Sequence, residues 1–165
     1  IPESFYFDLI NPKKINNEKL IEIYREDSNK LAKEIKADIA YIDPPYNSRQ
    51  YSRFYHIMEN IVQWKKPKLY GTAMKPKEEN MSEYCKVSAP VAFNDLIQKL
   101  NVKYIVVSYN NTYDSKSSSS KNKITLDEIE TILSNKGETK RFEKKYWAFN
   151  TGKTELNNHK EYIYN

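Results

Sequence analysis

The amino-acid sequence predicts an α/β fold whose sheet is mostly parallel and ends in an antiparallel hairpin. Three observations favour this class. The apolar runs at 38–43 and 103–109 are typical of buried strands. Helical patterns alternate with the strand patterns along the chain. The length of 165 residues is that of one ordinary domain. Residues 1–165 are therefore expected to form a single α/β domain.

Local signals place the elements of the first half. The run 19–24 predicts a strand, and a helix over 28–36 is expected to begin with Ser28 as its N-cap. The strand at 38–43 is expected to end at the two prolines that follow it. Residues 52–64 predict an amphipathic helix. Its apolar stripe is formed by side chains at helical spacing: Phe54, Ile57, Met58 and Ile61.

The middle of the chain continues the alternation. The basic stretch 65–80 predicts a long loop, and 88–100 predicts a helix before the strand at 103–109. The run 114–123 is rich in Ser and Lys and predicts a flexible polar loop.

The carboxyl-terminal part predicts one helix and two strands. Thr125 and Glu128 match a capping box that opens a helix over 126–135. Residues 140–149 and 160–164 predict the two strands of the final hairpin. Because ligands of open α/β sheets bind at the carboxyl ends of the strands, the residues that follow each strand are the first candidates for a site.

Composition excludes several classes of site. The chain has three Gly, at 71, 137 and 152, so it holds no Gly-rich loop for a phosphate or dinucleotide. Cys85 stands alone, which excludes an intrachain disulfide and a Cys-cluster zinc site, and no metal is expected. No apolar run reaches the roughly 18 residues of a membrane span. A reduced, cytoplasmic compartment is therefore expected.

The charge balance is basic, with a formal net charge of +5 and a pI near 9.0. A polyanion partner would explain this balance, and so would a general bias toward Lys, Asn, Ile and Tyr; both explanations stay open. Arginine is scarce, yet Arg49 and Arg53 lie close together. Since Arg carries a rigid fork of donors, this pair indicates a specific contact.

The most informative motif is the tetrapeptide Asp43-Pro44-Pro45-Tyr46 at the end of a predicted strand. Two prolines stiffen the backbone and remove two amide donors. The Asp43 carboxylate and the Pro44 carbonyl remain as acceptors beside the aromatic ring of Tyr46. Two acceptors and a stacking plane suit a flat molecule with an exocyclic amino group. The alternative is a plain turn that ends a strand.

The tetrapeptide resembles motif IV of the S-adenosylmethionine-dependent methyltransferases that modify the exocyclic amine of adenine in DNA. The longer string YIDPPYNSRQY at 41–51, followed by FYHIMENI at 54–61, resembles the FokI-type modification methylases within that family. The resemblance implies a Rossmann-like methyltransferase sheet, S-adenosylmethionine as methyl donor, DNA as partner and a role in restriction-modification. It also implies a catalytic set: Asp43, Pro44, Pro45 and Tyr46.

The same resemblance implies further site residues. Asp27 and Ser28 are similar to the element that holds the adenine of the cofactor, with Asp43 beside it. Asp27 has a plainer alternative as an acid favoured at a helix N-terminus. The stretch 108–110 resembles a later sheet motif of the family. DNA contacts are expected, against the alternative of solvated surface, from polar and basic residues: Asn47, Arg49, Arg53, Lys65, Lys66 and Lys68.

The chain departs from the family pattern in two respects. The Phe-x-Gly-x-Gly loop that holds the methionine part of the cofactor, and much of the region that reads DNA sequence, lie upstream in the family and are absent here. The chain thus resembles the carboxyl-terminal half, which lacks the first strands. The strand at 38–43 is then expected to have an open edge and to need an upstream half or a second chain. Two alternatives to a DNA adenine methyltransferase stay open: an RNA adenine methyltransferase and a catalytically silent nucleic-acid-binding relic.

Overall fold

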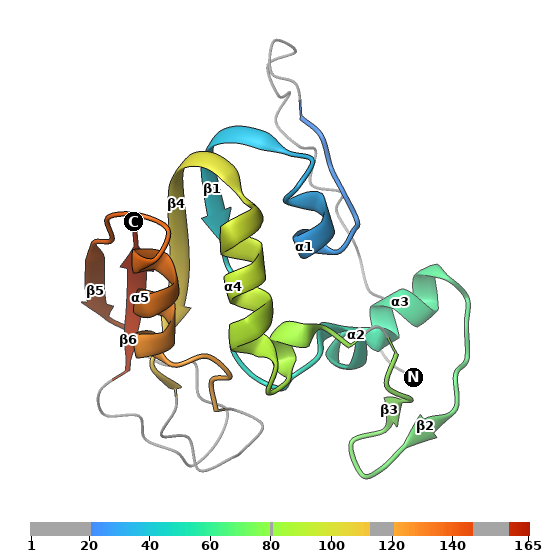
Figure 1. Cartoon of the computed structure of the whole chain (residues 1–165). Helices are drawn as coiled ribbons and strands as arrows, with labels where there is room; N and C mark the ends of the chain where they lie inside the picture. Colours follow the sequence, from blue (N-terminus) through green and yellow to red (C-terminus); the bar gives the residue numbers. More distant parts are fainter. Residues whose placement is uncertain (1–20, 80, 113–120, 147–158) are drawn as a thin grey trace, which may run out of the picture.

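The computed structural model describes residues 21–79, 81–112, 121–146 and 159–165. Helices and strands alternate along much of this part of the chain (Figure 1). The elements are α1 (Ser28–Leu31), β1 (Lys36–Ile42), α2 (Tyr51–Phe54), α3 (His56–Val62), β2 (Leu69–Tyr70), β3 (Lys75–Pro76), the 3-10 helix η1 (Glu83–Cys85), α4 (Ala89–Lys99), β4 (Asn101–Asn110), α5 (Leu126–Ser134), β5 (Arg141–Lys145) and β6 (Lys160–Tyr164).

A four-stranded sheet with the order β1-β4-β6-β5 organises the fold. β1 pairs with β4 in parallel, with Ile42 opposite Val107. β6 lies between β4 and β5 and is antiparallel to both, so β1, β4 and β5 point the same way. The mixed α/β class and the antiparallel last pair are thereby confirmed. Because β6 is inserted beside β4, the β1–β4 pairing is the one parallel pairing among the described strands.

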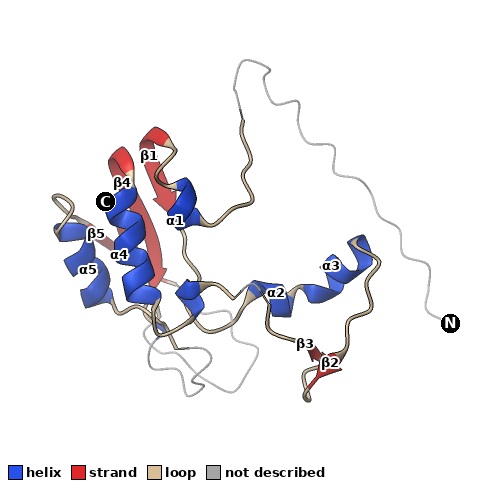
Figure 2. Cartoon of the chain, turned by 45° about the vertical axis from the view of Figure 1, so that its right-hand side comes forward, coloured by secondary structure: helices blue, strands red, loops and turns tan. Residues whose placement is uncertain are grey.

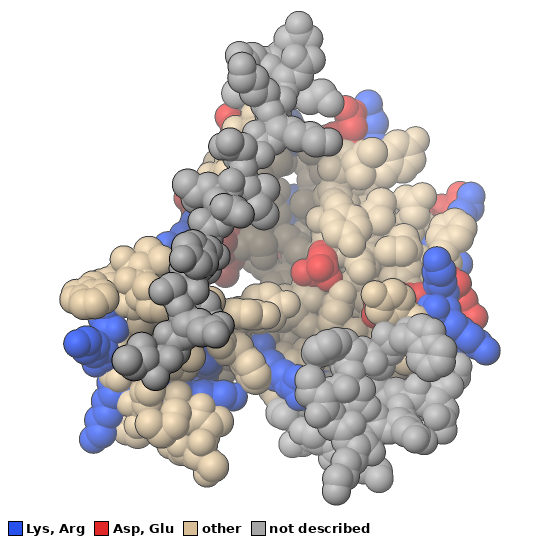
Figure 3. Space-filling view, turned by 180° about the vertical axis from the view of Figure 1, so that it is seen from behind, with Lys and Arg blue, Asp and Glu red and all other residues tan. Residues whose placement is uncertain are grey.

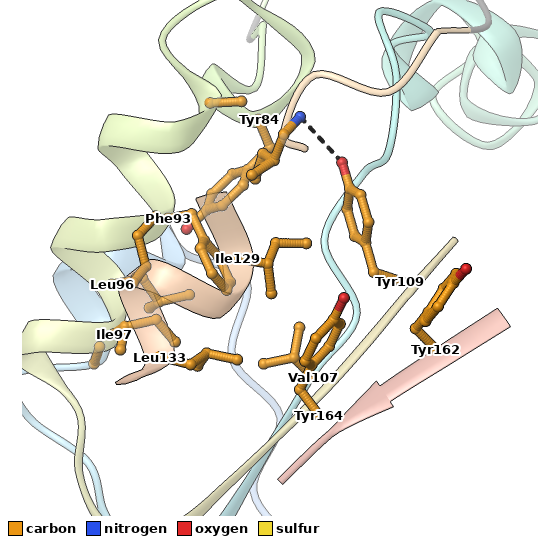
Figure 4. Packing of buried hydrophobic residues seen from close by; sticks show 14 residues of the cluster. Tyr84, Phe93, Leu96, Ile97, Val107, Tyr109, Ile129, Leu133, Tyr162 and Tyr164 are labelled. Carbon is orange, nitrogen blue, oxygen red and sulfur yellow. Dashed lines mark hydrogen bonds between the residues drawn. The ribbon is translucent and has the colours of Figure 1, made fainter. Parts of the chain in front are cut away.

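Helices α1, α4 and α5 lie over the same face of this sheet (Figures 1 and 2). Phe93 and Ile97 of α4 and Ile129 of α5 are buried against Val107 and Tyr109 of β4 (Figure 4). The capping box at the start of α5 is confirmed, since the side chains of its first and fourth positions bond each other's backbone N–H as predicted. This layer is the hydrophobic core that holds the strand ends in place.

The opposite face of the sheet carries exposed apolar side chains. Since successive side chains of a strand alternate between faces, the core lies on one side, and Ile39, Tyr41 and Tyr104 point to the other. Their exposed fractions are 61%, 64% and 59%, and Phe142 on β5 is 57% exposed. Figure 3 shows this side of the molecule from behind. No described strand pairs with the outer edge of β1, which agrees with the open edge expected at 38–43.

An arm, defined as residues 51–79, projects from the sheet layer and carries α2, α3 and the small β2–β3 ribbon (Figures 1 and 2). Where the sequence predicted one helix over 52–64, the structure has two short helices that meet at Tyr55. The predicted loop 65–80 contains the ribbon.

The predicted apolar stripe of 52–64 is not buried, which corrects that prediction. His56 is the one buried residue of α3, whereas Ile57 and Ile61 are each 60% exposed. The reason is that the spacing of apolar residues shows which face of a helix is apolar but not whether a neighbouring layer covers it.

The predicted strand at 19–24 is also wrong within the described residues. Residues 21–25 form no helix or strand, and Ile23 is 91% exposed; residues 19 and 20 lie outside the described part. A strand needs a neighbour for its backbone groups, and the described sheet offers none on that side of β1.

The helix predicted over 28–36 is only α1, and its N-cap is Asp27 rather than Ser28. The Asp27 carboxylate accepts a hydrogen bond from the backbone N–H of Lys30, whereas the Ser28 hydroxyl lies near Asn29 instead. The strands expected over 140–149 and at 103–109 are observed as β5 and β4, with 147–149 outside the described residues. The predicted loop 114–123 lies largely outside them too.

Candidate active site

Polar residues gather where the strands of the sheet end. Asp43 follows β1 directly, and Ser108 and Asn110 are among the last three residues of β4. Because β6 runs the opposite way, its first residues lie at this same edge, with Glu161 opposite Asn110. The edge that sheet topology assigns to ligands therefore collects groups from three strands.

The turn after β1 is held firmly in place. The Tyr46 hydroxyl donates a hydrogen bond of 2.6 Å to Oδ1 of Asp43. The Tyr46 ring meets the Tyr109 ring edge to face, with centroids 5.0 Å apart and planes at 82°. The Tyr46 carbonyl accepts from the backbone N–H of Lys123 at 2.8 Å. The Tyr109 hydroxyl in turn accepts from the N–H of Ile124 (Figure 4).

These contacts give the tetrapeptide a rigid geometry with one accessible acid. Pro44 is buried, whereas Asp43 is exposed. Burial, followed by the hydrogen bond to Asp43, raises the pKa of Tyr46 above its ordinary value, and a hydrogen bond with Ser108 acts in the opposite direction. Tyr46 therefore stays protonated at neutral pH and acts as a donor to the carboxylate.

A second carboxylate lies close to this cluster. Nε2 of His159 is 3.3 Å from Oε1 of Glu161. Burial raises the pKa of Glu161, His159 opposes that shift, and the charge of Asp43 adds to it. The charge of Asp43 therefore lies close enough to Glu161 to contribute to the raised pKa of that carboxyl.

A cavity of about 450 Å³ brings together some of the predicted catalytic and cofactor residues, although Asp27 and Tyr46 are not among those that line it. Asp43, Pro44 and Pro45 line it at one end, and Ser28 lines it from α1. Its other walls are mostly apolar side chains of β1, α1 and α4, including Leu31, Ile42 and Leu96. The fold thus brings Ser28 and Asp43 to one cavity although they are remote along the chain.

The position of α1 at this cavity is set by hydrogen bonds to α4. Asn29 Nδ2 donates to the carbonyl of Ala92 and to Asp95, each at 2.8 Å. The Tyr84 hydroxyl donates to Asn29 Oδ1 at 2.8 Å. Burial is the largest cause that raises the pKa of Tyr84, to about 12. Asp27, by contrast, is exposed at the start of α1 and is engaged as its N-cap.

The predicted DNA-contacting residues fall into two groups. Asn47, Arg49 and Arg53 lie just after the tetrapeptide. Asn47 Oδ1 accepts from the N–H of Arg49, and Arg53 forms a 2.6 Å ion pair with Glu78. The second group follows α3 on the arm and is not brought to the tetrapeptide: Lys65, Lys66 and Lys68.

Three positions near the site were missed by sequence reasoning. Gln50 is only 4% exposed; its amide accepts from the N–H of Ser82 at 2.9 Å and donates to the Ser82 carbonyl at 3.3 Å. Glu161 and His159 complete the set. No local pattern marks these residues, because their roles come from contacts between distant segments.

Two kinds of feature are absent from the described residues. None of their helices has the length and apolar character to cross a membrane. No group of three or more His, Cys, Asp or Glu side chains is arranged there to hold a metal ion.

Comparison with known proteins shows which protein family this chain resembles. The profile of the D12 class N6 adenine-specific DNA methyltransferases matches residues 8–158. The type II methyltransferase M.FokI of Planomicrobium okeanokoites is 42% identical over 124 residues, which is 74% of this chain and 18% of that protein. The modification methylase StsI of Streptococcus sanguinis is 46% identical over 98 residues, or 58% of this chain and 15% of that protein.

A third relative is matched over more of this chain. The type II methyltransferase M.NlaIII of Neisseria lactamica is 33% identical over 141 residues, which is 84% of this chain and 39% of that protein. The chain spans less than one fifth of the length of M.FokI and StsI. No solved structure gives a significant match. The family match covers most of the chain and includes the Asp43–Tyr46 turn, so the chain belongs to the D12 class of N6 adenine-specific DNA methyltransferases.

Proposed function

We propose that this chain carries the catalytic part of an S-adenosylmethionine-dependent enzyme that methylates the exocyclic amine of adenine in DNA. The observation that carries the proposal is the exposed Asp43 carboxylate at the end of β1, on a cavity that Ser28 also lines. Membership of the D12 class supports the substrate, and the names of the relatives support a place in restriction-modification. Such an enzyme would act on DNA in the cytoplasm.

The chemistry asked of Asp43 follows from the electronic structure of adenine. The lone pair of the amino nitrogen is delocalised into the ring, so the nitrogen is a poor nucleophile. Asp43 and the Pro44 carbonyl would each accept one amino hydrogen, which frees the lone pair and favours the positive charge that develops on nitrogen. The freed lone pair would take the methyl group that the donor supplies, and the methylated amine would then lose its surplus proton to solvent.

Tyr46 would have two roles in capture of the base. A base inside a duplex is out of reach, so it must leave the stack at a cost of a few kcal/mol. Contact with an aromatic ring returns about 1–3 kcal/mol. The Tyr46 hydroxyl occupies Asp43 as a donor, and we infer that the adenine amine takes over this donor position when the base enters.

The residues at the cavity fit part of the methyl donor. Its apolar walls suit an adenine ring, and Ser28 and Asp43 are among the polar residues that line it. Asp27 would contact the cofactor from the start of α1, in addition to its role as N-cap. When bound, the cofactor supplies an activated methyl group. Gly71, Gly137 and Gly152 are too far apart for the Gly-rich loop that would hold the methionine part.

We also propose that this α/β domain is a Rossmann-like methyltransferase sheet that is completed by further polypeptide, either an upstream half or a second chain. The support is structural. The outer edge of β1 has no partner strand among the described residues, and the face that carries Ile39, Tyr41 and Tyr104 is exposed. An open apolar edge promotes association. Sedimentation of a stable, unaggregated monomer with no partner would oppose this proposal.

Substrate choice separates the proposal from its two alternatives. In the test, the full-length protein is incubated with labelled S-adenosylmethionine and either DNA or RNA of the same sequence. The methylated base in the product is then identified. N6-methyladenine in DNA is the expected result. Transfer to RNA alone would select the RNA adenine methyltransferase. Salt-sensitive DNA binding with no transfer to either polymer would select the silent relic.

A further inference from the structure

Trp64 occupies an unusual position at the end of α3. Its backbone φ is +52°, a left-handed conformation that favours glycine. The N–H of Lys65 bonds the Asn60 carbonyl at 2.9 Å, and the N–H of Trp64 bonds the Ile61 carbonyl at 3.2 Å, which is a helix-closing arrangement. The ring is 80% exposed. The described fold therefore holds a large aromatic in a strained position without burying it.

The arm repeats one pattern of side chains around this ring. The Lys66 ammonium lies 5.7 Å from the centroid of the Trp64 ring. Lys68 lies 5.5 Å from the centroid of Tyr70. Further along, the Lys75 ammonium lies 4.0 Å from the Phe54 ring. Exposed rings and ammonium groups thus alternate over the arm, and residues 65–77 contain five Lys and no acid.

The Trp64 ring also borders a hollow. A cavity of about 370 Å³ is lined by Trp64 together with Ile57, Ile61 and Leu69, and by Lys65 and Lys66. Its wall is apolar, and cations stand beside it. A ligand with a flat apolar ring and a negatively charged group beside it would match both the apolar wall and the lysine side chains.

This combination favours single-stranded nucleic acid over a protein partner. Nucleobases stack on aromatic side chains while the backbone phosphates meet cations. Lysine is depleted at protein–protein interfaces, yet here one lysine ammonium lies near each of three rings of the arm, those of Trp64, Tyr70 and Phe54. Charge complementarity therefore identifies a polyanion as the occupant.

The arm is joined to the candidate active site at both of its ends. Gln50, just after the tetrapeptide, is bonded to Ser82 by two hydrogen bonds. The Arg53–Glu78 ion pair lies one step further out. These contacts fasten the two ends of the arm to each other, a few residues after the turn that carries Asp43.

We propose that Trp64 is a stacking platform for an unpaired nucleobase of the bound DNA strand, with Lys65, Lys66 and Lys68 at the flanking phosphates. The proposal rests on DNA as the substrate of the proposed function. It assigns to the arm a contact with bases that are not the methylated adenine. The strain at Trp64 is then the structural cost of presenting the ring to the ligand.

The test uses a fluorescent dT12 oligonucleotide, which contains no adenine, and measures its anisotropy with the protein and its variants. Trp64→Gly is expected to bind about tenfold more weakly, while its thermal unfolding midpoint rises or stays unchanged because glycine accepts the φ of +52°. Trp64→Phe retains most of the affinity. Phe142→Ala, which removes a 57% exposed ring on β5, is the matched control and leaves the affinity unchanged.

Three results would overturn the proposal: no binding of dT12 by the unchanged protein, equal binding by Trp64→Gly, or an equal loss in Phe142→Ala. A change in sedimenting mass of Trp64→Gly with unchanged dT12 binding would instead identify the arm as a protein-docking surface. Failure here is distinguishable from failure of the proposed function. Asp43→Ala is expected to abolish methyl transfer and to leave dT12 binding intact.

Discussion

Tyr46 and Asp43, three positions apart in one tetrapeptide, are joined by a 2.6 Å hydrogen bond from the tyrosine hydroxyl to the carboxylate. The bond gives the exposed acid of the motif a donor before any base arrives. The tyrosine ring also packs edge to face against Tyr109. The motif is therefore a preassembled unit of acceptor, donor and ring.

Substitutions of Tyr46 separate its ring from its hydroxyl. Tyr46→Phe keeps the ring against Tyr109 and should lower the free energy of unfolding by about 1 kcal/mol or less. Tyr46→Ala empties a half-buried site and should cost about 2 kcal/mol, roughly half the cost at a fully buried one. Urea titration measures both values.

The same pair of variants tests base capture. Tyr46→Ala should weaken DNA binding by the full-length protein more than it weakens S-adenosylmethionine binding, because the ring contacts the base in the proposed complex. Calorimetric titration with each ligand gives the comparison. An equal loss for both ligands would contradict the role assigned to the ring.

Gln50 is expected to be a major stabilising residue of the site. Gln50→Ala would remove the side-chain acceptor of the half-buried Ser82 N–H, while the Ser82 carbonyl would keep its bond from the N–H of Cys85; the expected cost is about 1–3 kcal/mol. Gln63→Ala is the control, since that side chain is exposed and its bond to Glu59 is a surface contact; it should cost about 0.5 kcal/mol or less. Similar urea midpoints for the two variants would refute the prediction.

Cys85 is expected to be unreactive in the folded protein. It is 4% exposed, its thiol lies 3.8 Å from the Arg49 carbonyl, and burial raises the pKa of the thiol. Since the thiolate is the reactive form, alkylation by iodoacetamide at pH 8 should be far slower in native protein than in urea-unfolded protein. Equal rates, followed by mass spectrometry, would show that the thiol is accessible.

Glu161 should make stability depend on pH. Burial is the largest cause that raises its pKa, so the folded protein favours the protonated carboxyl. The associated stability is fully present below the ordinary Glu pKa and is lost as the pH rises through the raised value. Glu161→Gln should therefore raise the thermal midpoint more at pH 7 than at pH 4.

The matched control for this effect is Glu138→Gln. Glu138 is exposed after α5, with its side chain 85% accessible beside Lys140. This variant should change the midpoint little at either pH. A larger gain in Glu161→Gln at pH 4 than at pH 7 would reverse the predicted sign.

The parts of the fold that were predictable from sequence are those with strong local signals. The apolar run before Pro44 became β1, and Thr125 with Glu128 capped α5, because both depend on residues that are neighbours in sequence. The stripe at Ile57 and Ile61 was assigned to the core and is exposed. Burial depends on a covering layer, which no local pattern specifies.

The site divides in the same way. The sequence motif singled out Asp43 and Tyr46 as candidates, and the structure places both after β1, where the strands of the sheet end. Glu161 and Gln50 were not predictable, since each gains its role from a partner far away in the chain. Trp64 was missed because its position at the end of α3, with a positive φ, depends on where the helix stops.

The most direct test of the central claim is methyl transfer by the Asp43→Asn variant. Full-length protein with and without the substitution would be given labelled S-adenosylmethionine and adenine-containing DNA, and N6-methyladenine would be measured in single turnover. Asparagine keeps the shape of the side chain but removes the charge that favours the developing positive nitrogen. Loss of transfer by about 100-fold or more, and larger than any loss of cofactor affinity, is predicted. Transfer at the unchanged rate would contradict the assignment of Asp43 as the catalytic residue.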